Sequence, residues 1–331
     1  MKIGRRTFLG LGAAVALPCP ARAQRMLPVV GFLHEASADA YAANAPTFAE
    51  GLRQAGFVEA QNLAIEYRFA AGQVDSLAGM AADLAHSGVV LIVAGGARAA
   101  MVAAAATTTI PIVFVTGSDP FQLGLVTNPD RPGGNVTGVT FITAGLSDEK
   151  LDLLDQLVPQ AERIGYLAED PSQAGARSRA IEGLKSEMSA SAGRLGREVI
   201  LAEIGPGHDY EAAFALFEKR RADAVVVAPS LVFANDADDL VGAASVHEVP
   251  TIYPRRADVL AGGLMSYGAR LAEAWRACGV RVGELLQGAK AADLPVIRAS
   301  GLELVISRLI AKSLGLAVPA SLLARADEVL D

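Results

Sequence analysis

The sequence predicts an α/β protein of two lobes that are built alike, each a parallel sheet with helices on both faces. Three observations favour this fold class. Short apolar runs alternate with longer helix-like stretches along the chain, one proline- and glycine-rich segment interrupts the alternation, and the blocks on its two sides have similar lengths. Strands that alternate with helices are typical of parallel pairing. The length of 331 residues suits two such lobes.

In the first block we expect four strands separated by three helices. The strands are residues 29–33, 63–69, 89–94 and 112–115, and the helices are residues 39–55, 74–86 and 97–107. The segment NPDRPGGN, residues 128–135, ends this block because proline and glycine interrupt regular structure. Residues 136–142 then predict a strand that crosses to the second lobe.

The second block repeats this pattern. Its expected strands are residues 163–168, 198–204, 224–228 and 251–253, and its expected helices are residues 148–157, 178–191, 210–219 and 236–247. A second crossing segment is expected near residue 265. We therefore predict an N-terminal lobe of residues 24–142, completed by 267–293, and a C-terminal lobe of residues 143–266, completed by 294–331.

Residues 1–23 predict a signal peptide for export. Arg5 and Arg6 lie in a basic start, residues 11–17 form an apolar stretch that is too short to span a bilayer, and Ala21-Arg22-Ala23 has the form of a cleavage site. The mature chain would begin near Gln24 and lie in the periplasm. The arginine pair favours the twin-arginine route, and an ordinary Sec signal with two chance arginines is the alternative.

The charge balance disfavours binding to nucleic acid, and the cysteine count excludes an intrachain disulfide in the mature chain. Cleavage removes four basic residues and no acidic one, so the net charge of −7 becomes −7 − 4 = −11. An acidic chain without a basic cluster is not expected to bind nucleic acid. Cleavage also removes Cys19 and leaves Cys278 alone, which excludes an intrachain disulfide. We expect a soluble monomer.

Small and polar residues follow most of the predicted strands. In open parallel sheets, ligands bind beyond the carboxyl ends of the strands, where helix N-termini offer free N–H groups and a partial positive charge. The residues at these positions are His34, Gly96, Ala97, Thr116, Ser118, Asp119, Asp170, Ser230 and Arg255. This pattern predicts that a polar small molecule binds where the two lobes face each other.

The chemistry of these residues indicates a solute with at least one carboxylate, an amino acid or a close relative. Gly96 and Ala97 lead into a helix whose N–H groups can receive an anion. Asp119 offers a carboxylate to an ammonium group, or it caps a helix that starts at Pro120. Arg255 would favour a second acidic group on the ligand, or it is a solvated charge at the rim.

The sequence lacks the motifs of catalysis, cofactor binding and metal binding. The stretch GGARAA after the third strand has no P-loop lysine, and neither G-x-G-x-x-G nor G-x-S-x-G occurs. The four histidines do not have metal-ligand spacing. We therefore expect that the protein is not an enzyme and needs no cofactor and no metal.

Six stretches together resemble the periplasmic ABC-transporter substrate-binding proteins whose characterised members bind tryptophan or tyrosine. They are FAEGLRQAGFVEAQNLAIEYRFAAG, TIPIVFVTGSDPFQLGLV, RPGGNVTGVT, PTIYPRRADVLAGGLMSYG, GAKAADLPV and PASLLARADEVL. The resemblance implies a type I periplasmic-binding-protein fold, with two Rossmann-like lobes, a hinge of crossing strands and a ligand held between the lobes. It also implies an integral-membrane ABC permease and its cytoplasmic ATPase as partners.

The resemblance also assigns ligand loops to positions of this chain, and the chain departs from the family at two of them. The loops fall on Gly96-Ala97, Ser118-Asp119, Thr140, Asp170, Ser230 and residues 253–258. Relatives usually offer a hydroxyl group after the third strand, where this chain has only Gly95-Gly96-Ala97. Relatives often carry an aromatic residue in the last stretch, where Arg255 and its neighbours stand here. Both departures disfavour an aromatic amino acid as the ligand.

Two other functions stay open beside a binding protein for import. An exported two-lobed enzyme of the racemase or lyase type would need an acid–base pair, for which His34 and Asp119 are the candidates. A sensory module would bind a ligand in the same way but would dock on a receptor instead of a permease.

Overall fold

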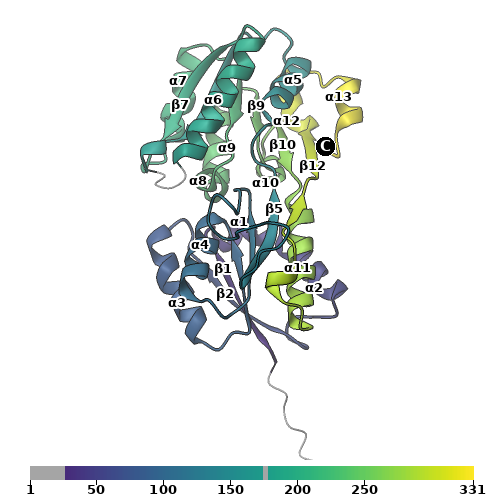
Figure 1. Cartoon of the computed structure of the whole chain (residues 1–331). Helices are drawn as coiled ribbons and strands as arrows, with labels where there is room; N and C mark the ends of the chain where they lie inside the picture. Colours follow the sequence, from purple (N-terminus) through teal and green to yellow (C-terminus); the bar gives the residue numbers. More distant parts are fainter. Residues whose placement is uncertain (1–26, 174–177) are drawn as a thin grey trace, which may run out of the picture.

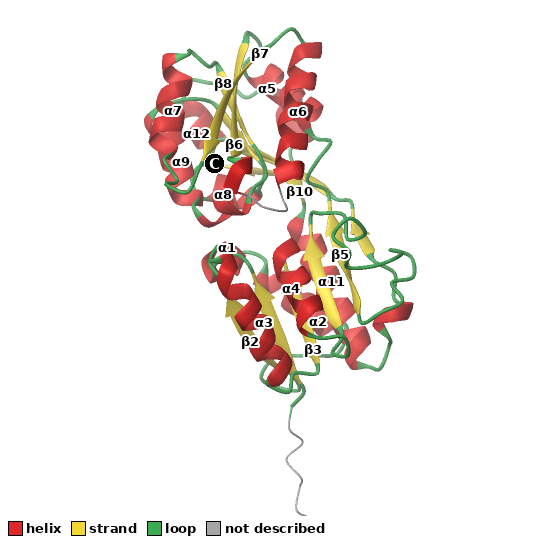
Figure 2. Cartoon of the chain, turned by 60° about the vertical axis from the view of Figure 1, so that its left-hand side comes forward, coloured by secondary structure: helices red, strands yellow, loops and turns green. Residues whose placement is uncertain are grey.

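The structure, a computed structural model, describes residues 27–173 and 178–331. The expected signal peptide and the expected start of the mature chain at Gln24 lie outside the described residues. The chain forms two α/β lobes, shown in Figures 1 and 2, and the predicted fold class is confirmed.

The first lobe is built on a six-stranded sheet in the order β11-β5-β4-β3-β1-β2, and all of its pairs are parallel. Its strands are β1 (Val29–His34), β2 (Ala64–Phe69), β3 (Leu91–Gly95), β4 (Ile112–Thr116), β5 (Val136–Phe141) and β11 (Ile297–Ala299). Its helices are α1 (Ala38–Ala42), α2 (Ala45–Gln54), α3 (Leu77–His86), α4 (Ala97–Ala106) and α11 (Leu271–Leu286).

Apolar residues on both faces of this sheet explain its two helical layers. Phe32 packs with α2 and α11, whereas its neighbour Leu33 packs with α3 and α4. Ile92 and Val93 of β3 divide between the same two clusters. Successive side chains of a strand point to opposite faces, so a strand that is apolar throughout requires a cover on each side.

The second lobe holds a seven-stranded sheet in the order β13-β12-β10-β9-β8-β6-β7. Its strands are β6 (Arg163–Glu169), β7 (Glu198–Ile204), β8 (Ala224–Val227), β9 (Thr251–Tyr253), β10 (Met265–Ala269), β12 (Leu302–Ser307) and β13 (Glu328–Leu330). Its helices are α5 (Ser147–Leu157), α6 (Ser178–Arg194), α7 (Tyr210–Lys219), α8 (Leu231–Asn235), α9 (Ala237–Val246), α10 (Arg256–Leu260), α12 (Arg308–Ser313) and α13 (Ala320–Arg325).

Three segments of the described chain cross between the lobes: residues 142–146 after β5, Arg270 after β10, and residues 300–301 after β11. We expected crossings near residues 140 and 265, and the third was not predicted. It also explains why β12 is antiparallel to β10. β10 ends at a crossing, whereas β12 begins at one, so the two neighbours run in opposite directions.

Two of the lobe boundaries that we expected differ from those given by strand pairing in the two sheets. Residues 267–269 were assigned to the first lobe, but they pair with β12 in the second sheet. Residues 294–299 were assigned to the second lobe, but Ile297–Ala299 pairs with Val139–Phe141 of β5 in the first sheet. Each lobe is therefore assembled from separate pieces of chain.

Local chemistry explains two differences in the helices. The expected helix 39–55 is divided into α1 and α2, because Pro46 has no N–H to continue a helix and sits instead in the first turn of α2. The short α8 was not predicted, although Ser230 accepts the Val232 N–H at its start and is a good N-cap residue.

Candidate functional site

The carboxyl ends of the strands lie on the sides where the two lobes meet. β5 enters the first crossing at its carboxyl end, and β1 to β4 run parallel to it. β10 enters the second crossing at its carboxyl end, and β6, β8 and β9 run parallel to it. The strand ends that precede the predicted binding residues therefore lie on the facing sides of the two lobes (Figure 1).

Strand register brings several predicted residues of the first lobe together. Thr116 pairs with Thr140 across β4 and β5. Thr116 is buried, and its Oγ1 accepts the Ser118 N–H at 3.1 Å. Thr140 Oγ1 donates to the Ile297 carbonyl at 3.4 Å. Two hydroxyl groups are thus fixed side by side on adjacent strands, next to the loop that carries Asp119.

Asp119 is exposed at the end of this loop. Its Oδ1 accepts the Phe121 N–H at 2.9 Å, and turns rather than a helix follow Pro120. The alternative interpretation of Asp119 as a helix cap is therefore wrong. The side chain shapes a turn instead, because a short carboxylate can bond the backbone two residues on. An Asn side chain could make the same bond without the charge.

The N-terminus of α4, where we expected a ligand anion, is occupied by the side chain of Glu35. Glu35 Oε2 accepts the Arg98 N–H at 3.2 Å. Gly96 has φ +102°, and a Cβ there would overlap the Glu35 carboxylate. The Gly96 N–H donates to the Val115 carbonyl at 2.8 Å, so it is not the free group that we expected, and a carboxylate of the chain already complements this helix end. A second anion there would be repelled.

His34 lies in an aromatic cluster and is held in its neutral form. Its ring stacks on Trp275 and lies 5.3 Å from the ring of Tyr41, measured between centroids. Burial lowers the pKa of His34 to about 4. Its Nδ1 accepts the Ala36 N–H at 2.9 Å, which leaves Nε2 as the protonated nitrogen. A Cβ on Gly95 would overlap this ring, so glycine is required there.

In the second lobe, the predicted residues are bonded within the protein. Asp170 Oδ1 accepts the Ser172 N–H at 2.8 Å, and the hydrogen bonds from the Ser172 side chain and backbone hold the pKa of Asp170 below its usual range. Ser230 caps α8 and donates to Oε2 of the buried Glu169 at 2.8 Å. These contacts fix both side chains at the facing end of the lobe.

Arg255 is neither the solvated charge nor the unpaired cation that we expected. Its guanidinium forms an ion pair with Asp258, whose side chain is 1% exposed, and donates to the Phe233 carbonyl at 3.1 Å. The partner lies three residues on, within one helical turn, so the spacing R-x-x-D was the signal in the sequence. Compensation by Asp258 removes the argument for a second acidic group on the ligand.

One described hydrogen bond joins the facing ends directly. The Ser37 N–H, just before α1, donates to Oδ1 of Asn235 at the end of α8, at 3.0 Å. A Cβ on Gly72, whose φ is +80°, would lie 3.1 Å from Asn235 Nδ2. We call this contact the Asn235 latch. Nothing in the sequence pointed to it, because its partners are 198 residues apart.

Over residues 27–173 and 178–331, no helix combines the length and the apolar character needed to cross a membrane. Within the same residues, no three His, Cys, Asp or Glu side chains gather in a way that would hold a metal ion.

Comparison with known proteins identifies relatives over almost the whole chain. A family model described as ABC transporter substrate binding protein matches residues 29–330. A tyrosine-binding protein of Clostridioides difficile (strain R20291) is 23% identical over 260 residues, which cover 78% of this chain and 73% of that protein.

Solved structures agree with this match. An ABC domain of Streptococcus pneumonia in complex with L-Trp is 25% identical, with a TM-score of 0.78 over 92% of this chain and 100% of that one. A conserved domain protein of Vibrio cholerae has a TM-score of 0.79 at 24% identity, over 92% of this chain and 100% of its own, and supports the fold.

Proposed function

Because this chain belongs to the family of ABC transporter substrate-binding proteins, we propose that it is the extracytoplasmic binding protein of an importer. It captures a small solute between its two lobes and presents the closed form to a membrane permease, which its ATPase drives. Export through the N-terminal signal and cleavage near Ala23 would place it in the periplasm. The observation that carries the proposal is the family match over residues 29–330, joined to strand ends that face each other across three crossings.

The solute that we propose is an amino acid or a close relative. The tyrosine-binding protein of Clostridioides difficile and the ABC domain in complex with L-Trp support this ligand class. In this chain Asp119 is the exposed carboxylate for the ammonium group, and the Ser118 hydroxyl is a donor for the ligand carboxylate. Thr140 Oγ1, whose proton goes to the Ile297 carbonyl, is a further acceptor for the ammonium group. Binding shifts the lobes toward a closed state because the ligand contacts both of them only there.

The contacts of His34 do not favour the enzyme alternative. A general base needs an open lone pair near the reacting proton. His34 Nδ1 accepts the Ala36 N–H, and the ring packs against Tyr41 and Trp275.

A thermal-shift screen of the mature protein with the common amino acids tests the ligand class. L-tryptophan and L-tyrosine are the first probes, and calorimetric titration then compares Asp119→Asn with the wild type. The Asn side chain keeps the acceptor for the Phe121 N–H and removes the charge. We expect a tenfold to hundredfold weaker complex, since a charge-assisted hydrogen bond contributes roughly 1.5–3 kcal/mol and each 1.4 kcal/mol is a factor of ten.

Asp130→Asn is the matched control. It makes the same chemical change at another exposed aspartate of the first lobe and should bind as the wild type does. If Asp119→Asn also binds like the wild type, Asp119 only shapes its turn. If no amino acid raises the melting temperature, the proposed ligand class is wrong.

A further inference from the structure

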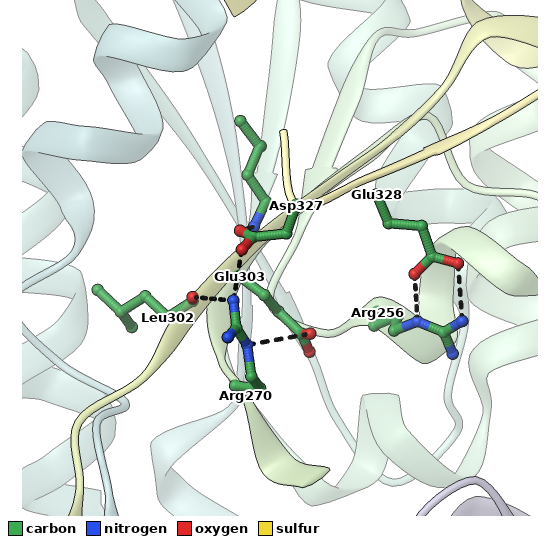
Figure 3. Close-up of polar contacts among 7 residues, drawn as sticks. Arg256, Arg270, Leu302, Glu303, Asp327 and Glu328 are labelled. Atoms are coloured by element: carbon green, nitrogen blue, oxygen red, sulfur yellow. Dashed lines mark hydrogen bonds and ion pairs between the residues drawn. The ribbon is translucent and has the colours of Figure 1, made fainter. Parts of the chain in front are cut away.

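Arg270 occupies the second crossing and contacts the third. Its backbone N–H donates to the Gly301 carbonyl at 2.9 Å, and its Nη2 donates to the Leu302 carbonyl at 3.2 Å. Nε lies 3.9 Å from Oε2 of Glu303, and Nη2 forms an ion pair with Asp327 (Figure 3). The backbone of Arg270 therefore ties the second crossing to the third, and its side chain joins them to the C-terminal segment, which we define as residues 320–331.

The C-terminal segment contacts the second crossing itself and the second-lobe elements that follow the other two crossings. Arg325 Nη1 pairs with Oδ2 of Asp152 at 2.9 Å, on the helix α5 that follows the first crossing. Asp327 pairs with Arg270 in the second crossing. The same Asp327 accepts the Leu304 N–H at 2.9 Å, on the strand β12 that follows the third crossing.

A second ion pair extends this attachment toward the candidate site. Glu328 holds Arg256 with two contacts, Nε to Oε2 at 2.5 Å and Nη2 to Oε1 at 2.8 Å (Figure 3). Arg256 is the first residue of α10 and follows Arg255 directly. Two parallel N–H···O bonds fix direction as well as distance. The C-terminal segment is thus linked both to the crossings and to the loop beside the candidate site.

We propose that the C-terminal segment is a brace for the hinge, with Arg270 and Asp327 as its positioning residues. It holds the second-lobe ends of all three crossings as one unit, so that the lobes rotate about residues 142–146, 270 and 300–301 together. The stretch PASLLARADEVL, which the site does not use, acquires a role in this way. The consequence for ligand capture rests on the proposed function, whereas the mechanical part concerns the free protein.

The ion pair of Arg270 with Asp327 is better suited to directing the motion of the hinge than to stabilising the fold. Their side chains are 41% and 42% exposed, and exposed ion pairs contribute little to folding. Loss of the pair would leave the fold intact and free the crossings to bend separately. If closed molecules then become rarer, the apparent dissociation constant of a ligand rises, because it equals the intrinsic constant divided by the fraction of closed molecules.

Distance measurement between the lobes of the free protein tests the brace without any ligand. Spin labels on Ala78→Cys of α3 and Ser189→Cys of α6, both at exposed positions, report the distance by pulsed electron paramagnetic resonance. Cys278 is buried and does not take the label. We expect Asp327→Asn to widen the distribution of distances relative to the wild type. Arg270→Lys should widen it too, since one ammonium does not reproduce a guanidinium whose Nη2 bonds Asp327 and Leu302 while its Nε faces Glu303.

Asp331→Asn is the matched control. It breaks the exposed pair with Arg308, 3.1 Å long, within the same segment but away from every crossing. Its distribution should equal that of the wild type. The proposal is overturned if Asp327→Asn and Arg270→Lys, at unchanged helix content, give the wild-type width, or if Asp331→Asn widens it equally. Because no ligand is added, neither result depends on whether the proposed amino acid binds.

Discussion

At the scale of single residues, most polar side chains described at the facing ends of the lobes have hydrogen-bond or ion-pair partners within the protein. Glu35 complements the start of α4, Asp258 pairs with Arg255, and Ser230 donates to Glu169. Charges withdrawn from water require such partners, because an unpaired buried charge is costly. A residue type at a strand end therefore predicts polarity there, but it does not predict which group will be left for a ligand.

The neutral His34 predicts how stability depends on pH. Its pKa is about 4 in the folded chain and near 6.5 when exposed, so the unfolded chain binds more protons between these values. Stability should fall as the pH drops from 6.5 to 4, by about 3 kcal/mol at one pKa unit per 1.36 kcal/mol. Urea unfolding at pH 7 and pH 4 measures this loss.

His34→Asn separates this effect from other acid-sensitive groups. An Asn side chain can accept the Ala36 N–H, yet it does not titrate. We expect the variant to lose less stability than the wild type over the same pH interval. Equal losses would mean that His34 does not govern the response.

At the scale of elements, the helices α1 and α8, which contact each other between the lobes, are short. α1 and α8 have five residues each, follow strand ends and contact each other. Helices of this length show too little periodicity to be recognised in a sequence. The Asn235 latch joins these two elements, so it belongs to a part of the structure that the residue pattern did not reveal.

Removal of the latch should favour the open form. Asn235→Ala deletes the acceptor of the Ser37 N–H, a hydrogen bond of about 0.5–1.5 kcal/mol, which corresponds to a shift of roughly twofold to tenfold in the equilibrium between closed and open molecules. Small-angle scattering of the free protein should show a larger radius of gyration. Asn62→Ala provides the comparison, because Asn62 bonds Val58 and Gly56 inside one lobe. Asn235→Ala with unchanged dimensions would show that the latch does not influence the equilibrium.

At the scale of the whole molecule, neither lobe is a continuous piece of chain. α11 and β11 leave the second lobe to complete the first, and α11 packs against α2 there. Trp275, the single tryptophan of the chain, is a buried residue of α11 in the first-lobe core. Its fluorescence therefore reports on a lobe whose segments are separated in the chain by the other lobe.

We expect the two lobes to unfold together. The first-lobe core needs α11, and the piece of chain that carries α11 and β11 is joined at both ends to strands of the second lobe, β10 and β12. Trp275 fluorescence and far-ultraviolet circular dichroism should give the same urea midpoint, as coincident probes do in a two-state transition. A fluorescence midpoint at clearly lower urea would show that the first lobe unfolds on its own.

The sequence by itself determined the two-lobed α/β fold, the strands before each candidate loop and the family. Alternation of apolar strands with helices is a local pattern, and it can be recognised in a sequence wherever helices cover both faces of a parallel sheet. Only the tertiary structure decided that Glu35 occupies the start of α4, that Asn235 reaches Ser37, and that Asp327 meets Arg270. These partners lie 63, 198 and 57 residues apart. Hydrogen bonds and ion pairs depend on distance in space, which a spacing along the chain does not encode.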